Sequence, residues 1–174
     1  MLKTTANKIT LLRIVLIPVF LILCYTGHTN WAFAAYLIAC LSDFADGYIA
    51  RHYNQITDWG KFMDPLADKM LVLAAMCFFV ECRTMPGWVV AVVLFREFAV
   101  SGLRLVAVEQ GRVIAAAWSG KIKTASTMVA LGLMLLFGGF RIVNRICWIV
   151  IFITTVWSGV EYFMKNLDVF QNAD

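Results

Sequence analysis

The sequence predicts an all-α membrane protein that crosses the bilayer with six transmembrane helices. Hydrophobic residues make up 61% of the 174 residues and charged residues only 15%, whereas soluble domains average about 45–50% and 25%. The mean hydropathy is +0.79. Apolar segments recur along the whole length without a Pro, Gly or Ser-rich linker between them. We therefore expect one transmembrane domain over residues 1–174.

Six apolar segments approach or exceed the ~20 residues that a spanning helix needs. They cover residues 8–26, 31–55, 61–82, 87–108, 116–140 and 143–165. The first is longer than a signal-peptide core and is not followed by a small-residue cleavage site, so we expect it in the mature protein. Pro18 is expected to bend this helix. Turn-forming residues separate the segments at 26–30, 53–58, 82–87, 109–112 and 138–141.

Basic residues near the segment ends predict the orientation, because cytoplasmic loops carry an excess of Lys and Arg. In a six-span arrangement one side holds Lys3, Lys8, Arg13, Arg51, His52, Lys61, Arg112, Lys121, Lys123 and Lys165. The other side holds Arg83, Arg141 and Arg145, and the last two are an exception to the rule. We therefore expect a multi-pass protein of the cell membrane with both termini in the cytoplasm.

Charge and cysteine spacing argue against two kinds of site. The net charge of +4 is spread over the segment ends, so a nucleic-acid surface is not expected. The five cysteines show no CxxC spacing and lie mostly in apolar segments, where cysteine behaves as a small hydrophobe. We predict neither a zinc site nor a disulfide.

Four aspartates lie at the ends of two adjacent apolar segments. Helical positions i, i+3, i+4 and i+7 share a face, and in the second segment they hold Asp43, Asp46, Gly47 and Ala50. Positions i, i+4 and i+8 in the third segment hold Gly60, Asp64 and Asp68. Pro65 is expected to strain or delay the start of that helix. If the two helices are neighbours, four carboxylates converge beside small residues that leave room for a ligand.

Convergent carboxylates predict a metal site. Four such groups repel one another and resist desolvation unless a cation neutralises them. Oxygen ligands without histidine or thiolate favour Mg²⁺ or Mn²⁺, which commonly bind together with substrate phosphates. Two such ions can clamp a phosphoryl group. The alternative is that the acids form ordinary salt bridges with Arg51, Lys61 and Lys69. Four acids on two helix faces are more than such salt bridges require.

The acidic pattern resembles the signature of the CDP-alcohol phosphotransferases. It reads D-x2-D-G-x2-A-R-x8-G-x3-D-x3-D without a mismatch between Asp43 and Asp68. Further segments are similar to one branch of that family: NKITLLRIVLIP at the start, GKFMDPLADK, REFAVSGLR at 96–104, GKIKT at 120–124 and SGVEYF at 158–163. The resemblance covers nearly the full length.

The resemblance implies a fold and an activity. The fold would be six transmembrane helices in a homodimer, with a polar cavity that opens to the cytoplasm. The activity would be transfer of the phosphatidyl group from CDP-diacylglycerol to sn-glycerol 3-phosphate, which releases CMP. By the same resemblance, Asp43, Asp46 and Asp64 would hold two divalent ions, and Asp68 would share in that shell and act as general base. The residues that approach the CDP moiety would be Asp43, Gly47, Arg51 and Gly60.

Polar residues at the start of the first segment leave two alternatives open. Asn7 and Thr10 would either cap the first helix or contact cytidine. Arg13, one turn further on, would equally well extend to the membrane interface.

Cations in the fourth and fifth segments predict a binding site for the acceptor phosphate. Arg96 and Arg104 in the fourth segment and Lys121 and Lys123 at the start of the fifth lie within apolar surroundings on the expected cytoplasmic half. Glu97 is expected to partner only one of these cations. A dianionic phosphate would satisfy the remainder, with Arg gripping it through two hydrogen bonds. The alternative is that these residues anchor the helices at the interface, which we favour more for Lys123 than for Lys121.

Aromatic residues near the segment ends are expected to lie at the membrane interface. Tyr162 would either add a hydroxyl to the phosphate site or belong to an aromatic belt with Trp157 and Phe163. We assign a belt or packing role to Trp31, Trp59, Trp88 and Trp148.

Other classes of function fit the sequence less well. A six-helix transporter would show inverted repeats or helices broken in corresponding halves, and the three prolines form no such symmetry. A structural role leaves the acidic faces unexplained. Within the enzyme class, the alternative acceptors are inositol phosphate, a second phosphatidyl group and an amino alcohol. A choline-type acceptor would call for aromatic or acidic residues rather than arginines.

Overall fold

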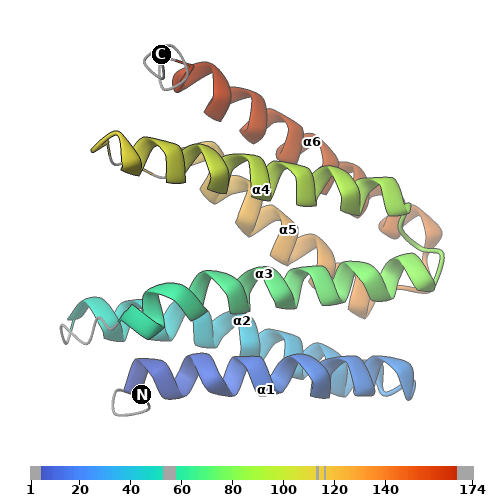
Figure 1. Cartoon of the computed structure of the whole chain (residues 1–174). Coiled ribbons are helices and arrows are strands. Elements are labelled where there is room, and N and C mark those ends of the chain that lie inside the picture. Colours follow the sequence, from blue (N-terminus) through green and yellow to red (C-terminus); the bar gives the residue numbers. More distant parts are fainter. Residues whose placement is uncertain (1–4, 53–57, 113, 116, 168–174) are drawn as a thin grey trace.

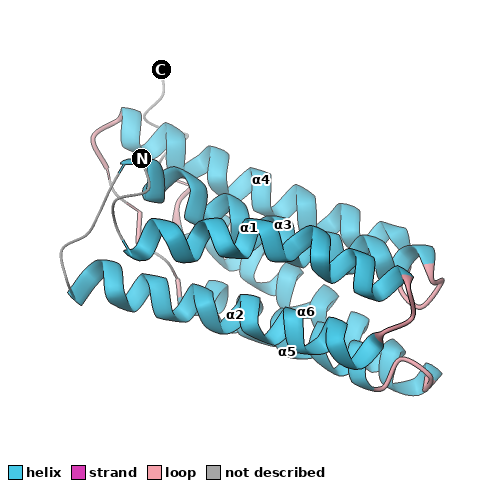
Figure 2. Cartoon of the chain, turned by 90° about the horizontal axis from the view of Figure 1, so that it is seen from below, coloured by secondary structure: helices cyan, strands magenta, loops and turns pink. Residues whose placement is uncertain are grey.

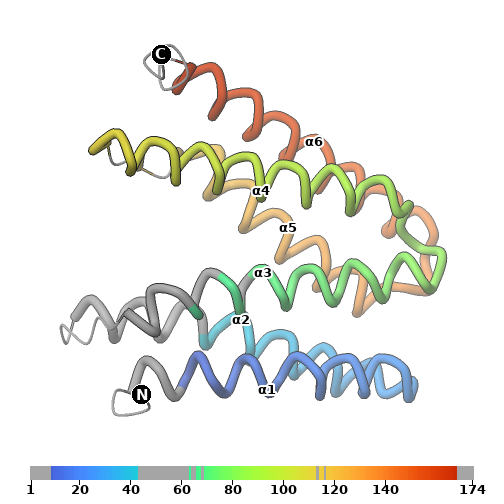
Figure 3. The backbone as a smooth tube through the Cα atoms, in the orientation of Figure 1, coloured from blue at the N-terminus to red at the C-terminus, as the bar shows by residue number. Residues whose placement is uncertain are grey.

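The structure is a computed structural model of the chain. It describes residues 5–52, 58–112, 114–115 and 117–167, with their side chains except at 5–8, 43–52, 58–62, 64–65 and 68. The described part, coloured by residue number in Figure 3, contains helices and turns but no strand. The all-α fold class is therefore confirmed for these residues.

Six helices account for almost all of the described residues. They are α1 (Thr5–Tyr25), α2 (Thr29–His52), α3 (Asp58–Glu81), α4 (Gly87–Glu109), α5 (Trp118–Leu136) and α6 (Arg141–Lys165). Successive helices run in opposite directions, as Figure 1 shows. The starts of α1, α3 and α5 and the ends of α2, α4 and α6 consequently lie at one end of the bundle, which we call the aspartate end. The turns after α1, α3 and α5 lie at the other, the opposite end.

The helices pack in two connected groups. Helix α1 packs against α2 and α3, and α6 packs against α4 and α5, while α2 and α3 both contact α5 (Figure 2). The main core lies between these groups, and its fully buried side chains include Phe20, Tyr36, Met76, Leu131 and Ile151. The Tyr36 hydroxyl donates a hydrogen bond of 3.1 Å to the carbonyl of Met128. This bond satisfies the one polar atom of a buried ring.

Buried positions on α6 show why its sequence forms a helix with one packed face. The buried residues are Asn144, Cys147, Ile151, Thr155, Ser158 and Tyr162. They recur every three or four residues, which places them on one stripe of an α-helix. Residues between them, such as Ile146 and Ile153, are 56% and 57% exposed.

Large apolar side chains cover much of the outer surface. Phe95, Phe98, Trp118 and Ile142 are each more than 70% exposed, and the largest apolar patches on soluble monomers rarely exceed a few hundred Å². By length and hydropathy, α6 is the one described helix that could cross a membrane by itself, while Ile9–Tyr25 and Thr29–Ser42 are shorter apolar stretches. Helix α4 carries Arg96, Glu97 and Arg104 in its apolar sequence.

Two predicted boundaries are wrong. Helix α3 begins at Asp58, so Pro65 lies inside the helix and does not delay its start. Proline is tolerated within helices when neighbouring groups satisfy the backbone. Helix α5 ends at Leu136 rather than at residue 140, because Gly138 and Gly139 favour the turn that precedes α6. Pro18 does lie inside α1.

Three helices end in the same hydrogen-bonded turn. After α1, α3 and α4 the chain enters the left-handed region at Gly27, Arg83 and Gly111, with φ of 78°, 57° and 74°. After α3, the amide of Arg83 donates to the Val80 carbonyl (2.9 Å) and that of Thr84 donates to the Phe79 carbonyl (3.0 Å). This pair of bonds is the Schellman motif, which strongly favours glycine at its left-handed position. Arginine is therefore unusual after α3.

Replacing Arg83 by Gly should stabilise the protein by about 0.5–1 kcal/mol, since relief of the left-handed conformation exceeds the entropic cost of glycine. The measurement is the free energy of unfolding in detergent. Gly27→Ala and Gly111→Ala are matched controls, because a Cβ at either glycine meets no atom within 4 Å. Both should lose about 1 kcal/mol. Equal stability of Arg83→Gly and wild type would mean that the arginine side chain stabilises this turn through a contact.

Candidate functional site

The acidic signature falls on two helices that pack together. Asp43 and Asp46 belong to the last part of α2, and Asp64 and Asp68 to the first half of α3. The end of α2 and the start of α3 lie at the aspartate end, and the two helices contact each other (Figure 1). Eight predicted site residues are outside the part of the chain whose side chains the structure describes: Asn7, Asp43, Asp46, Gly47, Arg51, Gly60, Asp64 and Asp68. Their convergence on metal ions stays a prediction.

Thr10 and Arg13 of α1 are buried among the helices. Their exposed fractions are 1% and 0%. Helix α1 begins at Thr5, so neither Asn7 nor Thr10 stands at a cap position, and the capping alternative is wrong for both. Arg13 does not extend to the interface, so that alternative is also wrong. A buried arginine requires compensating partners inside the protein.

Glu97 of α4 joins three helices through ion pairs. Its Oε1 accepts hydrogen bonds from Lys123 Nζ of α5 (2.7 Å) and from Arg96 Nη1 (2.9 Å). Its Oε2 lies 3.7 Å from Lys69 Nζ of α3, which donates to Ser101 Oγ at 2.9 Å. We call Lys69, Arg96, Glu97 and Lys123 the Glu97 cluster. The expectation that Glu97 partners a single cation is wrong, because helices α3 and α5 each direct a lysine toward it.

The Glu97 cluster carries an excess of positive charge. Three cations and one carboxylate leave two positive charges. The side chains of Arg96 and Lys123 are only 12% and 7% exposed, so water screens these charges weakly. Arg96 Nε is buried and has no hydrogen-bond partner among the residues whose side chains are described. Such an arrangement favours a multivalent anion nearby.

Two glycines leave the space that Arg96 occupies. A Cβ at Gly159 of α6 would lie 3.3 Å from Arg96 Cγ, and one at Gly120 of α5 would lie 3.5 Å from Arg96 Nη2. These glycines belong to the sequence segments SGVEYF and GKIKT. Three of the five segments quoted for the family resemblance, including the segment 96–104 that holds Arg96, therefore meet around one arginine.

Lys121 and Lys123 exchange the roles expected for them. Lys123 is 6% exposed and lies on the buried face of α5 with Thr127, Ala130 and Met134. Lys121 is exposed, and its Nζ lies 5.0 Å from the centroid of the Trp118 ring. Residues two positions apart point about 200° apart around a helix. Lys123 therefore takes the interior position, and the interface role favoured for it is wrong.

Arg104 contacts Tyr162 across α4 and α6. Arg104 Nε donates a hydrogen bond of 2.8 Å to the tyrosine hydroxyl. Tyr162 is 2% exposed and packs with Val100, Leu103 and Ala107. Of the two alternatives for Tyr162, burial excludes a place in a lipid-facing belt, whereas Trp157 is 48% exposed. The structure thus pairs Arg104 with Tyr162, while Lys121 lies over the Trp118 ring.

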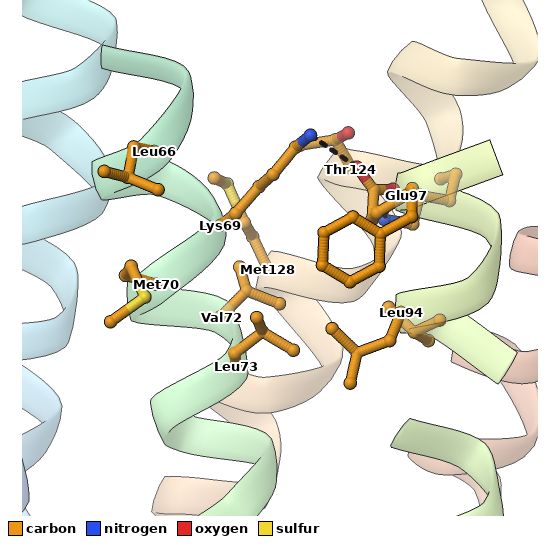
Figure 4. A pocket seen from close by; sticks show the side chains of 12 residues that line it. Leu66, Lys69, Met70, Val72, Leu73, Leu94, Glu97, Thr124 and Met128 are labelled. Atoms are coloured by element: carbon orange, nitrogen blue, oxygen red, sulfur yellow. Dashed lines mark hydrogen bonds and ion pairs between the residues drawn. The ribbon is translucent and has the colours of Figure 1, made fainter. Parts of the chain in front are cut away.

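An apolar cavity of about 330 Å³ lies beside the Glu97 cluster, between α3, α4 and α5. Figure 4 shows Lys69 and Glu97 facing each other above Met70, Leu73 and Leu94. Lys123 and Thr124 complete the polar part of the lining. The cavity is therefore charged at one side and apolar over the rest.

Sequence reasoning missed Lys69 as a member of this site and favoured an interface role for Lys123. Lys69 directly follows Asp68, and one residue turns a helix by about 100°. That offset directs Lys69 away from the acidic face of α3, toward α4. The helical periodicity of α3 predicts that Lys69 and Asp68 point in different directions. This prediction identifies a partner for Lys69 only when α4 is known to pack on the side that Lys69 faces.

Replacing Glu97 by Gln should destabilise the protein by about 2 kcal/mol, because it removes the acceptor of two charge-assisted hydrogen bonds and leaves buried cations facing one another. The free energy of unfolding in detergent measures the loss. Glu161→Gln is the matched control, since it breaks an ion pair with Lys165 whose lysine is 64% exposed, and such i,i+4 pairs contribute only about 0.3–0.5 kcal/mol. Similar losses in both variants would show that the Glu97 cluster does not hold the helices together.

Comparison with known proteins gives a consistent result. The family model described as CDP-alcohol phosphatidyltransferase matches residues 3–157. The CDP-diacylglycerol–glycerol-3-phosphate 3-phosphatidyltransferase of Bacillus subtilis is 40% identical, with 97% of both chains covered. The enzyme of that name in Escherichia coli K12 is 37% identical over 88% of this chain and 90% of its own. A probable phosphatidylglycerophosphate synthase of Mycobacterium tuberculosis is also 37% identical, over 93% of this chain and 81% of its own.

Proposed function

The chain belongs to the CDP-alcohol phosphatidyltransferase family, and from this premise we propose that it transfers the phosphatidyl group of CDP-diacylglycerol to sn-glycerol 3-phosphate. The products are phosphatidylglycerophosphate and CMP. Support comes from relatives at 37–40% identity that are named for this reaction. The observation that carries the choice of acceptor is the Glu97 cluster, whose two excess positive charges match a dianionic phosphate.

Four aspartates supply the donor set for the divalent ions of the proposed reaction. Asp43, Asp46 and Asp64, with a share from Asp68, would hold two Mg²⁺ or Mn²⁺ ions. The donor chemistry fits, because these residues are all carboxylates on the two packed helices α2 and α3, and hard ions prefer oxygen ligands. Bound there, the ions would stabilise negative charge on the phosphoryl oxygens and on the departing CMP.

The chain's own residues move the proton and hold the substrates. Asp68 takes the proton from the acceptor hydroxyl, which is a poor nucleophile at neutral pH. The hydroxyl oxygen forms a bond to the phosphorus that carries diacylglycerol, and the bond from that phosphorus to CMP breaks. Asn7, Thr10, Asp43, Gly47, Arg51 and Gly60 form the CDP site.

The acceptor phosphate is held by Arg96 and Arg104, with Lys121 and Tyr162 nearby. The two arginines lie eight residues apart on α4, about 12 Å along the axis, so their long side chains can converge on one group. The Glu97 cluster fixes Arg96, and Tyr162 fixes Arg104. The apolar cavity beside the cluster suits the apolar part of a lipid substrate.

Six membrane-spanning helices with the aspartate end in the cytoplasm complete the proposal. The antiparallel order of the helices and the exposed Phe95, Phe98 and Ile142 support a multi-pass arrangement. A homodimer is part of the same proposal.

The test of the proposed reaction is to incubate purified protein with CDP-diacylglycerol and radiolabelled glycerol 3-phosphate, inositol phosphate or glycerol. Label should enter the lipid fraction chiefly from glycerol 3-phosphate. Preference for inositol phosphate would assign the chain to another branch, and no transfer from any acceptor would contradict the enzymatic function.

A further inference from the structure

A second cavity lies at the opposite end of the bundle, far from the aspartates. Its volume is about 880 Å³, and it lies between the turn that follows α3 and the turn that precedes α6. Arg83, Arg141 and Arg145 all line it. These are the three arginines that fall on the non-cytoplasmic side in the sequence, where basic residues are disfavoured. The proposed transfer reaction gives them no role.

The three arginines have no carboxylate partner within the described part of the chain. All three are exposed, and no ion pair joins them to any described acid. Glu81, the nearest acid in sequence to Arg83, instead accepts a hydrogen bond from the Tyr25 hydroxyl. The cavity therefore collects three positive charges, and no described acid among its lining residues balances them.

Two helix N-termini add to the positive potential of this cavity. Helices α4 and α6 begin beside it, and their N-cap residues, Pro86 and Phe140, provide no side-chain hydrogen bond to the first turn. The first backbone N–H groups of a helix are unpaired donors at the positive end of the helix dipole. Such ends bind phosphate groups when charge and access permit. Gly87 and Gly139 line the cavity without side chains that would cover these groups.

Two residues that line the cavity, Arg83 and Asn144, have features that a bound ligand would explain. Arg83 occupies the left-handed position that glycine takes at the equivalent ends of α1 and α4. An arginine at this position is explained if its side chain is needed in the cavity. Asn144 also lines the cavity and is 4% exposed. Its Nδ2 donates to the Gly138 carbonyl (2.8 Å), while its Oδ1 has no partner among the described residues. As an acceptor, this oxygen would take a hydrogen bond from a hydroxyl of a lipid head group and not from the phosphate.

We propose that this cavity binds the phosphate group of an anionic phospholipid in the leaflet opposite the catalytic end. The assignment of the leaflet rests on the orientation given with the proposed function. A lipid fits better than free phosphate because apolar groups border the cavity. Ile142 is 75% exposed and Trp88 is 50% exposed, and the Trp88 ring packs edge-on against Trp148 at 5.8 Å. Acyl chains would lie along these residues while the arginines and the helix N-termini hold the phosphate.

Native mass spectrometry of the full chain in detergent tests this site. Phosphatidylglycerol and phosphatidylcholine are titrated against wild type and the Arg141→Gln/Arg145→Gln protein. Wild type should retain phosphatidylglycerol in preference to phosphatidylcholine, and the double variant should bind phosphatidylglycerol at least about tenfold more weakly. The control Arg112→Gln/Lys165→Gln, which removes two charges at the aspartate end, should bind it as wild type does.

A single variant keeps the test decisive if the double variant does not fold. Arg83→Gly should be at least as stable as wild type and yet bind phosphatidylglycerol more weakly, a combination that a structural role of Arg83 does not produce. Equal lipid binding by wild type and Arg83→Gly, or equal retention of the two lipids by wild type, would overturn the proposal. Displacement of the lipid by inorganic phosphate at comparable concentration would make this a site for free anions and overturn the assignment to a lipid. Transferase activity is measured in parallel, so that failure of the proposed reaction is seen separately.

Discussion

Asp43→Asn, Asp46→Asn and Asp64→Asn should each abolish transfer of the phosphatidyl group. An amide in place of a carboxylate lowers the negative charge of the site and weakens its hold on hard cations. Transfer of radiolabelled glycerol 3-phosphate to CDP-diacylglycerol measures the loss. EDTA should likewise abolish the activity of wild type, and added Mg²⁺ or Mn²⁺ should restore it. Full activity in two of the three variants would refute the assignment of these aspartates.

Asp68→Asn separates the general base from the metal ligands. If Asp68 accepts the proton, kcat should fall strongly while binding of CDP-diacylglycerol stays nearly unchanged, since three other carboxylates remain. A parallel loss of rate and of lipid-nucleotide binding would make Asp68 chiefly a ligand. Lys69→Gln is a useful control at the next position, because Lys69 contacts Glu97 and Ser101 and its loss should leave the metal dependence unaltered.

The fold was predictable to within a few residues because local rules decide it. Long apolar segments and turn residues predict helices, and all six helices begin within about three residues of the predicted positions, with α1 beginning at Thr5 instead of 8 and α5 at Trp118 instead of 116. Pro65 was expected to strain or delay the start of α3, but the helix begins at Asp58, before the proline, because packed helices tolerate proline in their interior. Where a helix begins or ends depends on the helices that pack against it, and the sequence alone does not identify these neighbours.

The candidate site was predictable in its residue types but not in its pairings. Charge in an apolar segment marks Arg96 and Arg104 for function. Which cation reaches Glu97 depends on the rotation of each helix about its axis, and this rotation places Lys123 inside and Lys121 outside. Packing between α3, α4 and α5 fixes those rotations. Sequence periodicity alone does not decide which of the two lysines faces the interior of the bundle. The prediction that favoured the membrane interface for Lys123 was wrong.

Arg96→Gln should raise the KM for glycerol 3-phosphate about ten- to hundredfold, which corresponds to one lost charge-assisted contact of roughly 1.5–3 kcal/mol. The KM for CDP-diacylglycerol should hardly change. Arg104→Gln should act in the same direction. Arg→Lys at either position should also impair acceptor binding, because an ammonium group cannot reproduce the paired hydrogen bonds of a guanidinium. Glycerol without its phosphate should be a very poor substrate of wild type.

The contacts of each cation predict a graded series that tests the acceptor site. Arg96 is 12% exposed and held by Glu97, so it is preorganised and its loss should be the most harmful. Tyr162→Phe removes only the hydroxyl that holds Arg104 at 2.8 Å and should reproduce part of the Arg104→Gln effect. Lys121 is exposed over Trp118, so Lys121→Gln should change the KM least. A larger effect for Lys121→Gln than for Arg96→Gln would move the phosphate toward the start of α5, and unchanged KM values in both arginine variants would remove it from α4 altogether.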